Sequence, residues 1–139
     1  YPKPRGIARA DEMLARGVNV SIGHDSVMDP WYSLGKACLL QQAFLMLHAG
    51  HMNGSEQIQE VFDMITTNSA KTLHLDNYGI AEGNQADLII FDAVTEDDIL
   101  RLQSECTYVI RKGKIICQTT PAQRKLTYDA EPTYVDFKL

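Results

Sequence analysis

The sequence of 139 residues is poor in cysteine, in basic residues and in long apolar runs. Its 3 cysteines are an odd number and include no Cys-x-x-Cys pair, which argues against a disulfide framework or zinc knuckle and predicts reduced thiols in the cytoplasm. With 13 Lys and Arg, scattered, against 18 Asp and Glu, we expect no nucleic-acid surface. No apolar run reaches the ~18 residues of a membrane span, so we expect no membrane segment.

The sequence also lacks a His-x-His pair, an internal repeat and a low-complexity tract. A hydrophobic fraction of 45% beside 22% charged residues is ordinary for a globular chain and too apolar for disorder. His48 and His51 share one helical face and are able to approach a metal together, although two ordinary helix histidines are the simpler account. The composition is therefore typical of an ordinary soluble, folded enzyme fragment.

One loop carries the most informative residues. Val18, Val20 and Ile22 alternate with polar residues, which predicts a strand over residues 18–22, and Gly23 allows a sharp turn where that strand ends. Asp25 then lies at the carboxyl end of a strand, where βα proteins hold their active sites. A solvated turn aspartate is the alternative interpretation.

The rest of the chain predicts helices first and short strands later. We expect a helix over residues 7–16, capped by Gly17, and a long helix over 30–51 that Asp29 and Pro30 begin. A new helix is expected from Gly54-Ser55 through Ile65, and a further short helix carries Ala70 and Leu73. Strands are predicted at 86–91, 107–111 and 114–118, with a short helix at 97–103 and a hairpin turn at Lys112-Gly113.

The motifs Gly23-His24-Asp25 and Asp29-Pro30-Trp31-Tyr32, with Arg5-Gly6-Ile7 and Gly17-Val18-Asn19-Val20, resemble the last part of the bacterial cytosine deaminase family, within the metal-dependent amidohydrolase superfamily. Less specific words of the same superfamily follow at residues 68–73, 78–80 and 83–90. The resemblance covers nearly the whole chain and loosens after Asp92.

The resemblance implies an α/β fold that is the C-terminal end of a (βα)8 TIM-type barrel, joined to the C-terminal strands of a small β-sandwich. We expect residues 1–76 to form the last barrel βα unit with its following helices, and residues 77–139 to form sandwich strands and a tail. A whole eight-unit barrel takes about 250 residues, so the 139 residues are expected to be an incomplete fragment. The aromatic tail after Pro121, with Tyr128, Tyr134 and Phe137, is expected to wrap on its own or a neighbouring subunit.

The resemblance also assigns roles to single residues. Asp25 matches the aspartate that contacts the metal and shuttles protons from the hydrolytic water, so it is both the expected catalytic residue and a metal ligand. Trp31 matches a tryptophan that lines the base pocket, and stapling the loop is its alternative role. Ser26 stands where relatives carry a second aspartate, which leaves room for a 5-methyl group and predicts a tolerance for 5-methylcytosine. His24 is expected to orient Asp25 or the substrate, or else to pack at the strand end.

The resemblance implies one divalent metal ion, iron or zinc, with the remaining ligands absent from this chain. It further implies a nucleobase substrate, the missing N-terminal part as a partner, and a homo-oligomer. Three functions stay open at this stage: a cytosine-type deaminase, an amidohydrolase acting on another ring such as a triazine or creatinine-like compound, and a non-catalytic fragment. The isolated chain is expected to be inactive.

Overall fold

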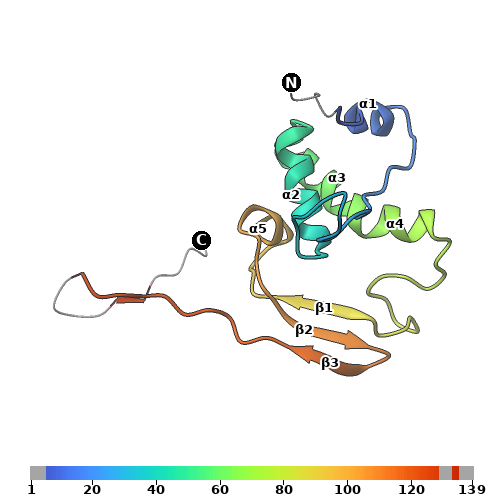
Figure 1. Ribbon diagram of the computed structural model, residues 1–139. Coiled ribbons are helices and arrows are strands. Elements are labelled where there is room, and N and C mark those ends of the chain that lie inside the picture. Colours follow the sequence, from blue (N-terminus) through green and yellow to red (C-terminus); the bar gives the residue numbers. More distant parts are fainter. Residues whose placement is uncertain (1–5, 129–132, 135–139) are drawn as a thin grey trace. The chain divides into compact units, whose positions relative to one another are not determined.

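The computed structural model describes residues 6–128 and 133–134. Contacts between residues divide the chain into two units, of which the first ends at Asn84 and the second begins at Gln85. The first unit is helical and the second is built mainly on strands (Figure 1). The boundary predicted between residues 76 and 77 divides a barrel part from a sandwich part, which is not the same as a division by contacts. That boundary stays a prediction.

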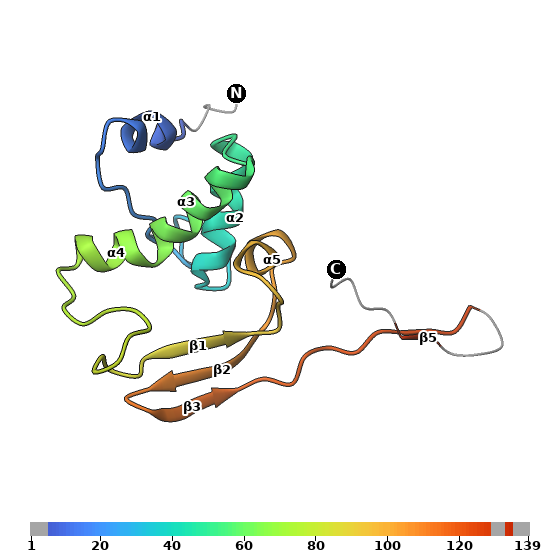
Figure 2. The same cartoon turned by 180° about the vertical axis from the view of Figure 1, so that it is seen from behind.

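Four helices make up the described part of the first unit. They are α1 (Ala10–Ala15), α2 (Leu39–Ala49), α3 (Ser55–Ile65) and α4 (Thr67–Thr72). Helix α2 packs against α3, and α4 follows α3 after one residue (Figures 1 and 2). The side chains buried in this unit are Ala10, Ala43, Leu47, Met52, Val61, Met64 and Ala70. Burial of each larger one contributes about 1.5–3 kcal/mol, so this small core is what holds the helices together.

Helices α1, α2 and α4 end in the same left-handed cap. The second residue beyond each helix, Gly17, His51 or His74, has a φ of 76°, 55° or 52°. After α1, for example, Val18 donates its N–H to the Met13 carbonyl at 3.0 Å and Gly17 donates to Leu14 at 2.8 Å. This pattern is the Schellman motif, and it satisfies carbonyls that a helix end leaves open. The predicted cap at Gly17 is confirmed, and His51 terminates a helix.

The strand predicted over residues 18–22 does not form. These residues belong to no strand ladder in the described chain, because no neighbouring strand is there to pair with them. Ile22 instead donates its N–H to the carbonyl of Met64, in the last turn of α3, at 2.9 Å. A helix end thus supplies the acceptor that a neighbouring strand supplies in a sheet.

The long helix predicted over residues 30–51 is wrong in its first half. Helix α2 begins at Leu39, and the residues before it form bends and irregular chain. Gly35 and Ala37 have φ values of 105° and 53°, which a right-handed helix cannot contain. Helix α1 is also shorter than the predicted range of 7–16.

The second unit contains a three-stranded antiparallel sheet in the order β1-β2-β3 (Figure 1). Its elements are β1 (Leu88–Phe91), α5 (Glu96–Arg101), β2 (Cys106–Arg111) and β3 (Lys114–Gln118), followed by the short pair β4 (Lys125–Leu126) and β5 (Thr133–Tyr134). The predicted sheet strands and short helix are confirmed to within two residues at each end. Thr95 begins α5 by accepting the Asp98 N–H on its hydroxyl at 3.2 Å.

The hairpin between β2 and β3 turns at Lys112 and Gly113, with φ values of 50° and 73°. Two successive positive φ values define the type I′ turn, which matches the natural twist of a hairpin. Asp87 fastens this turn: its carboxylate accepts the Lys112 N–H at 2.7 Å and lies 3.6 Å from the Arg111 guanidinium. The hydrogen bond from the Lys112 amide is the main cause that lowers the pKa of Asp87.

The tail offers little to test its predicted wrapping. Tyr128 is 89% exposed and Tyr134 is 67% exposed, while Phe137 lies outside the described residues. Among residues 6–128 and 133–134, no helix has both the length and the apolar character needed to cross a membrane.

We expect Asp87→Ala to lower the melting temperature of the complete protein at neutral pH. The folded-state pKa of Asp87 is depressed, so its stabilising contribution is present above the unfolded value of about 4 and is lost as the pH falls through the lower folded value. The difference in melting temperature between wild type and variant is therefore constant from pH 5 to 8 and shrinks below about pH 4. Thermal unfolding across this range checks it, with Glu82→Ala in the loop before β1 as the control. An unchanged difference at acid pH contradicts the assignment.

Candidate functional site

The loop of residues 23–38 contains His24, Asp25, Ser26 and Trp31, the residues to which the resemblance assigns roles. Two contacts lie at its base. The His24 imidazole lies against Gly35, where an added Cβ would come within 3.2 Å of Nε2. Lys36 donates its N–H to the Gln41 side-chain oxygen, in the first turn of α2, at 3.2 Å. Gly35 is therefore required twice, by its positive φ and by the imidazole beside it. The two ends of the loop therefore meet at His24 and Gly35, next to Asp25 in the sequence.

His24 fills the base of this loop. Its Nε2 atom is buried and has no hydrogen-bond partner among the described residues. A buried polar atom without a partner costs free energy, so it marks a place where a group is missing or where function tolerates the cost. The predicted roles, orienting Asp25 or packing at the segment end, both stay predictions, and the contact with Gly35 is a packing contact.

Asp29 organises the outer part of the loop. One oxygen of its carboxylate, Oδ1, accepts the N–H groups of Trp31 and Tyr32, each at 2.9 Å, and the Asp29 N–H donates to the Tyr32 carbonyl at 3.1 Å. Ser26 adds a side-chain hydrogen bond to the same carboxylate. The Tyr32 amide is the first cause, with Trp31 and Ser26, that lowers the pKa of Asp29. The capping geometry predicted for Asp29 thus exists, but it closes a turn and no helix follows it.

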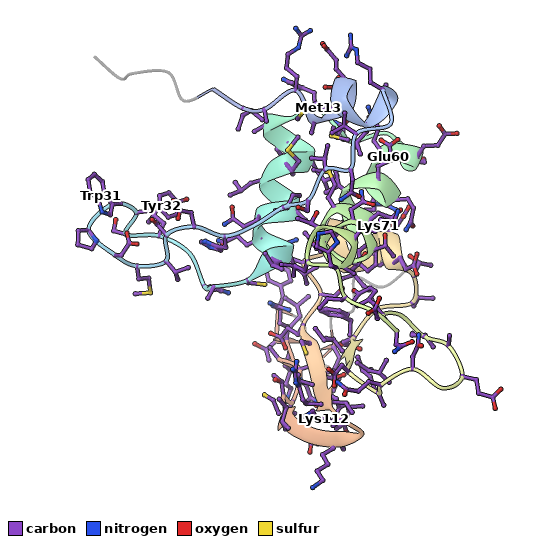
Figure 3. The ribbon with its side chains drawn as sticks, turned by 90° about the vertical axis from the view of Figure 1, so that its right-hand side faces the viewer. Met13, Trp31, Tyr32, Glu60, Lys71 and Lys112 are labelled. Atoms are coloured by element: carbon purple, nitrogen blue, oxygen red, sulfur yellow. The ribbon has the colours of Figure 1, made fainter. Side chains whose placement is uncertain are left out.

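Trp31 and Tyr32 lie at the tip of the loop, where it extends away from the helices of the first unit (Figure 3). The Trp31 side chain is 87% exposed. Ser26, Asp29 and Trp31 are brought together by the turn, whereas His24 lies at the loop base. The predicted contact of Trp31 with a substrate stays a prediction.

Asp25 is exposed, and its carboxylate has no hydrogen bond or ion pair with residues 6–128 or 133–134. Carboxylate oxygen is a suitable ligand for a divalent metal. In the part of the chain that the structure describes, however, no three His, Cys, Asp or Glu side chains gather where a metal ion could be held. Asp25 can therefore supply one ligand, and the described residues by themselves do not make a metal site.

Neither the role of Gly35 nor the side chains that anchor residues 18–22 could be recognised in the sequence. Gly35 was included in a predicted helix, although a glycine inside a helix costs about 1 kcal/mol relative to alanine and was a signal against it. The anchoring residues Asn19 and Thr72 are 53 positions apart, so no local pattern joins them.

The amidohydrolase family model matches residues 1–117. This match covers most of the chain, so the protein belongs to the amidohydrolase family, whose members generally use a divalent metal. The resemblance on which the sequence analysis relied is confirmed at this level.

The particular relatives are deaminases and a related hydrolase. The chain is 30% identical over 129 residues to the pterin deaminase of Rhizobium rhizogenes (strain K84 / ATCC BAA-868), covering 90% of this chain and 28% of that protein. It is 26% identical over 106 residues to the N-isopropylammelide isopropyl amidohydrolase of Pseudomonas sp. (strain ADP), covering 76% of this chain and 26% of that protein.

Two solved structures of one enzyme give higher identities, and a third structure gives a lower one. The 5-methylcytosine deaminase of Klebsiella pneumoniae, solved with phosphonocytosine, is 42% identical with a TM-score of 0.81, over 89% of this chain and 30% of that one. The same enzyme, solved with 5-fluorocytosine, is 39% identical with a TM-score of 0.84. This match covers 93% of this chain and 32% of that one. The N-isopropylammelide isopropylaminohydrolase of Burkholderia multivorans ATCC 17616 is 25% identical with a TM-score of 0.78. This match covers 84% of this chain and 30% of that one. This chain thus spans less than a third of the length of the relatives it matches.

We expect Asp29→Ala to release the loop tip. The Trp31 and Tyr32 amides lose their acceptor, so their hydrogen exchange in the complete protein becomes faster by about 2- to 10-fold, the factor that loss of an ordinary hydrogen bond produces. Asp29→Asn keeps one side-chain oxygen and serves as the matched control with a smaller change. Hydrogen exchange followed by mass spectrometry measures both variants. Equal exchange in wild type and Asp29→Ala contradicts the assigned turn.

Proposed function

We propose that this chain is part of a hydrolytic deaminase that converts cytosine, and preferentially 5-methylcytosine, to the corresponding uracil and ammonia. The observation that carries the proposal is the 42% identity, at a TM-score of 0.81, with a 5-methylcytosine deaminase that was solved with phosphonocytosine. The TIM-type barrel, the β-sandwich and the homo-oligomer belong to the same proposal.

Asp25 is the proposed proton carrier. Deamination needs water to attack the ring carbon that bears the amino group, and it needs a proton on the departing nitrogen. The exposed Asp25 carboxylate has no competing partner among residues 6–128 and 133–134, so it is free to accept the proton of the water and to pass it to the amine. A divalent iron or zinc ion, when bound, supplies a Lewis acid that lowers the pKa of water. Asp25 is the one ligand proposed from this chain.

Ser26 is the proposed determinant of preference for the 5-methyl group. Its side chain is uncharged and small, and it is held by Asp29 in the turn next to Asp25. An aspartate at this position adds volume and a charge, and both disfavour an apolar methyl group nearby. Trp31, at the tip of the same loop, is the proposed wall that packs against the flat base.

A second candidate is an amidohydrolase with another substrate. The matches to pterin deaminase at 30% and to the two N-isopropylammelide hydrolases at 25–26% favour it, and their lower identities place it second. Assays of the complete protein with cytosine, 5-methylcytosine, pterin and N-isopropylammelide decide between the two. Ammonia released from the cytosines supports the first candidate, and turnover of only the other substrates overturns it.

We expect Asp25→Asn in the complete protein to lower kcat by about 10²–10⁴-fold, because the amide keeps the shape of the side chain and cannot accept a proton. Steady-state release of ammonia measures the change, and the melting temperature checks that the variant is folded. Asp76→Asn, on an exposed loop after α4, is the matched control and keeps wild-type activity. A folded Asp25→Asn enzyme with more than a tenth of the wild-type kcat contradicts the assigned role.

We expect Ser26→Asp to lower the ratio of kcat/KM for 5-methylcytosine to kcat/KM for cytosine by at least about 10-fold, the usual effect of one methyl group that a pocket rejects. Ser26→Ala is the control, because it removes the hydrogen bond to Asp29 and adds neither volume nor charge. It should keep the wild-type ratio. An unchanged ratio in Ser26→Asp, or an equal loss in Ser26→Ala, shows that the size and charge at this position do not set the preference.

A further inference from the structure

We propose that Asn19 and Thr72 are positioning residues for Asp25, acting through a hydrogen-bond network that fixes the segment 18–22 on α4. The inference rests on the proposed function for the role of Asp25. It assigns a task to a part of the first unit that lies outside the loop, and the task follows from contacts between residues far apart in the sequence.

The network joins two polar side chains of the segment to Asn68, at the start of α4, and to Thr72, at its end. The Asn19 side-chain amide donates to the Asn68 carbonyl at 3.0 Å and to the Thr72 hydroxyl at 2.9 Å. The Thr72 hydroxyl lies 3.1 Å from the Ser21 hydroxyl and 3.0 Å from the Asn68 carbonyl. Asn19 and Ser21 are two positions apart, so an extended backbone places both on the same side of the segment.

The Thr72 hydroxyl is at the centre of the network, because it takes part in three of the hydrogen bonds. Its hydroxyl carries one hydrogen and two lone pairs, so it can accept from Asn19 while it donates once. When it donates to the Asn68 carbonyl, it can accept from Ser21 as well, and all three distances are then used. Valine has the shape of threonine without these groups, whereas serine keeps them.

The network matters for Asp25 because it joins the segment directly before Asp25 to α4. In the described chain, the backbone of residues 18–22 bonds to the helices at its two ends, from Val18 to Met13 in α1 and from Ile22 to Met64 in α3. Its hydrogen bonds to α4 are made by side chains alone. Asp25 follows Ile22 by three residues, across Gly23. A backbone displacement of 1 Å at such a distance is enough to lower a rate by about 10²-fold. The register of the segment on α4 therefore sets where the Asp25 carboxylate lies.

The test uses Thr72→Val, Thr72→Ser and Asn19→Ala in the complete protein. We expect Thr72→Val to lower kcat for the cytosines by about 10-fold with less than a threefold change in KM, and Thr72→Ser to restore kcat to within about twofold of wild type. Hydrogen exchange of the peptide that contains residues 18–25 becomes faster in Thr72→Val and not in Thr72→Ser. Thr67→Val is the matched control, because among the described residues the Thr67 hydroxyl, on the same helix, bonds to Asp63 and to no residue of the segment.

The double variant distinguishes positioning from a general loss of stability. If Asn19 and Thr72 act through one network, Thr72→Val adds little to the kcat loss of Asn19→Ala, whereas independent effects multiply. Equal losses in Thr72→Val and Thr72→Ser, or additive losses in the double variant, overturn the inference. If Thr72→Val fails to fold, Asn19→Ala decides alone: wild-type kcat and exchange refute the network. A wild-type protein that deaminates neither cytosine refutes the proposed function instead, and the exchange data still decide the anchoring.

Discussion

The hydrogen bond from the Ile22 N–H to the Met64 carbonyl joins the segment before Asp25 to the helices of the first unit. It answers two needs at once, because an extended backbone requires acceptors and the last turn of a helix has carbonyls without partners. The Met64 carbonyl also accepts the Ser69 hydroxyl at 2.7 Å, so the junction of α3 and α4 is fixed at the same atom. This junction therefore fixes where the following loop begins. The contact between His24 and Gly35 places the far end of the loop beside its start.

Elements with strong local signals could be predicted from the sequence. The periodicity of α3, the hairpin turn at Lys112-Gly113 and the apolar strand β1 are determined by neighbouring residues, and the structure has all three. Residues 18–22 have the alternation of a strand, but a strand also needs a partner, which no described part of the chain provides. The first half of the helix predicted over 30–51 does not form, although its apolar spacing is helical. Gly35 has a positive φ, which a right-handed helix cannot contain.

The candidate site likewise has features that could be predicted from the sequence and features that could not. Sequence motifs located the loop, and the capping oxygen of Asp29 was predictable because a short carboxylate captures nearby backbone amides. The sequence could not show that this carboxylate would close a turn, or that the Ser26 hydroxyl would be engaged by it. Asn19 and Thr72 meet only in the folded chain, and each alone has the appearance of an ordinary surface residue.

The contacts of the 18–22 segment also impose an order on assembly. Its side-chain partners lie 49 to 53 positions further along the chain. During synthesis from the N-terminus, the loop with Asp25 therefore leaves the ribosome well before the helix that receives it. Until residues 64–72 have emerged and formed a helix, the segment is held, among the described residues, only by the bond from Val18 to Met13 in α1. A nascent chain that stalls before that point contains Asp25 without the contacts that hold residues 19–22.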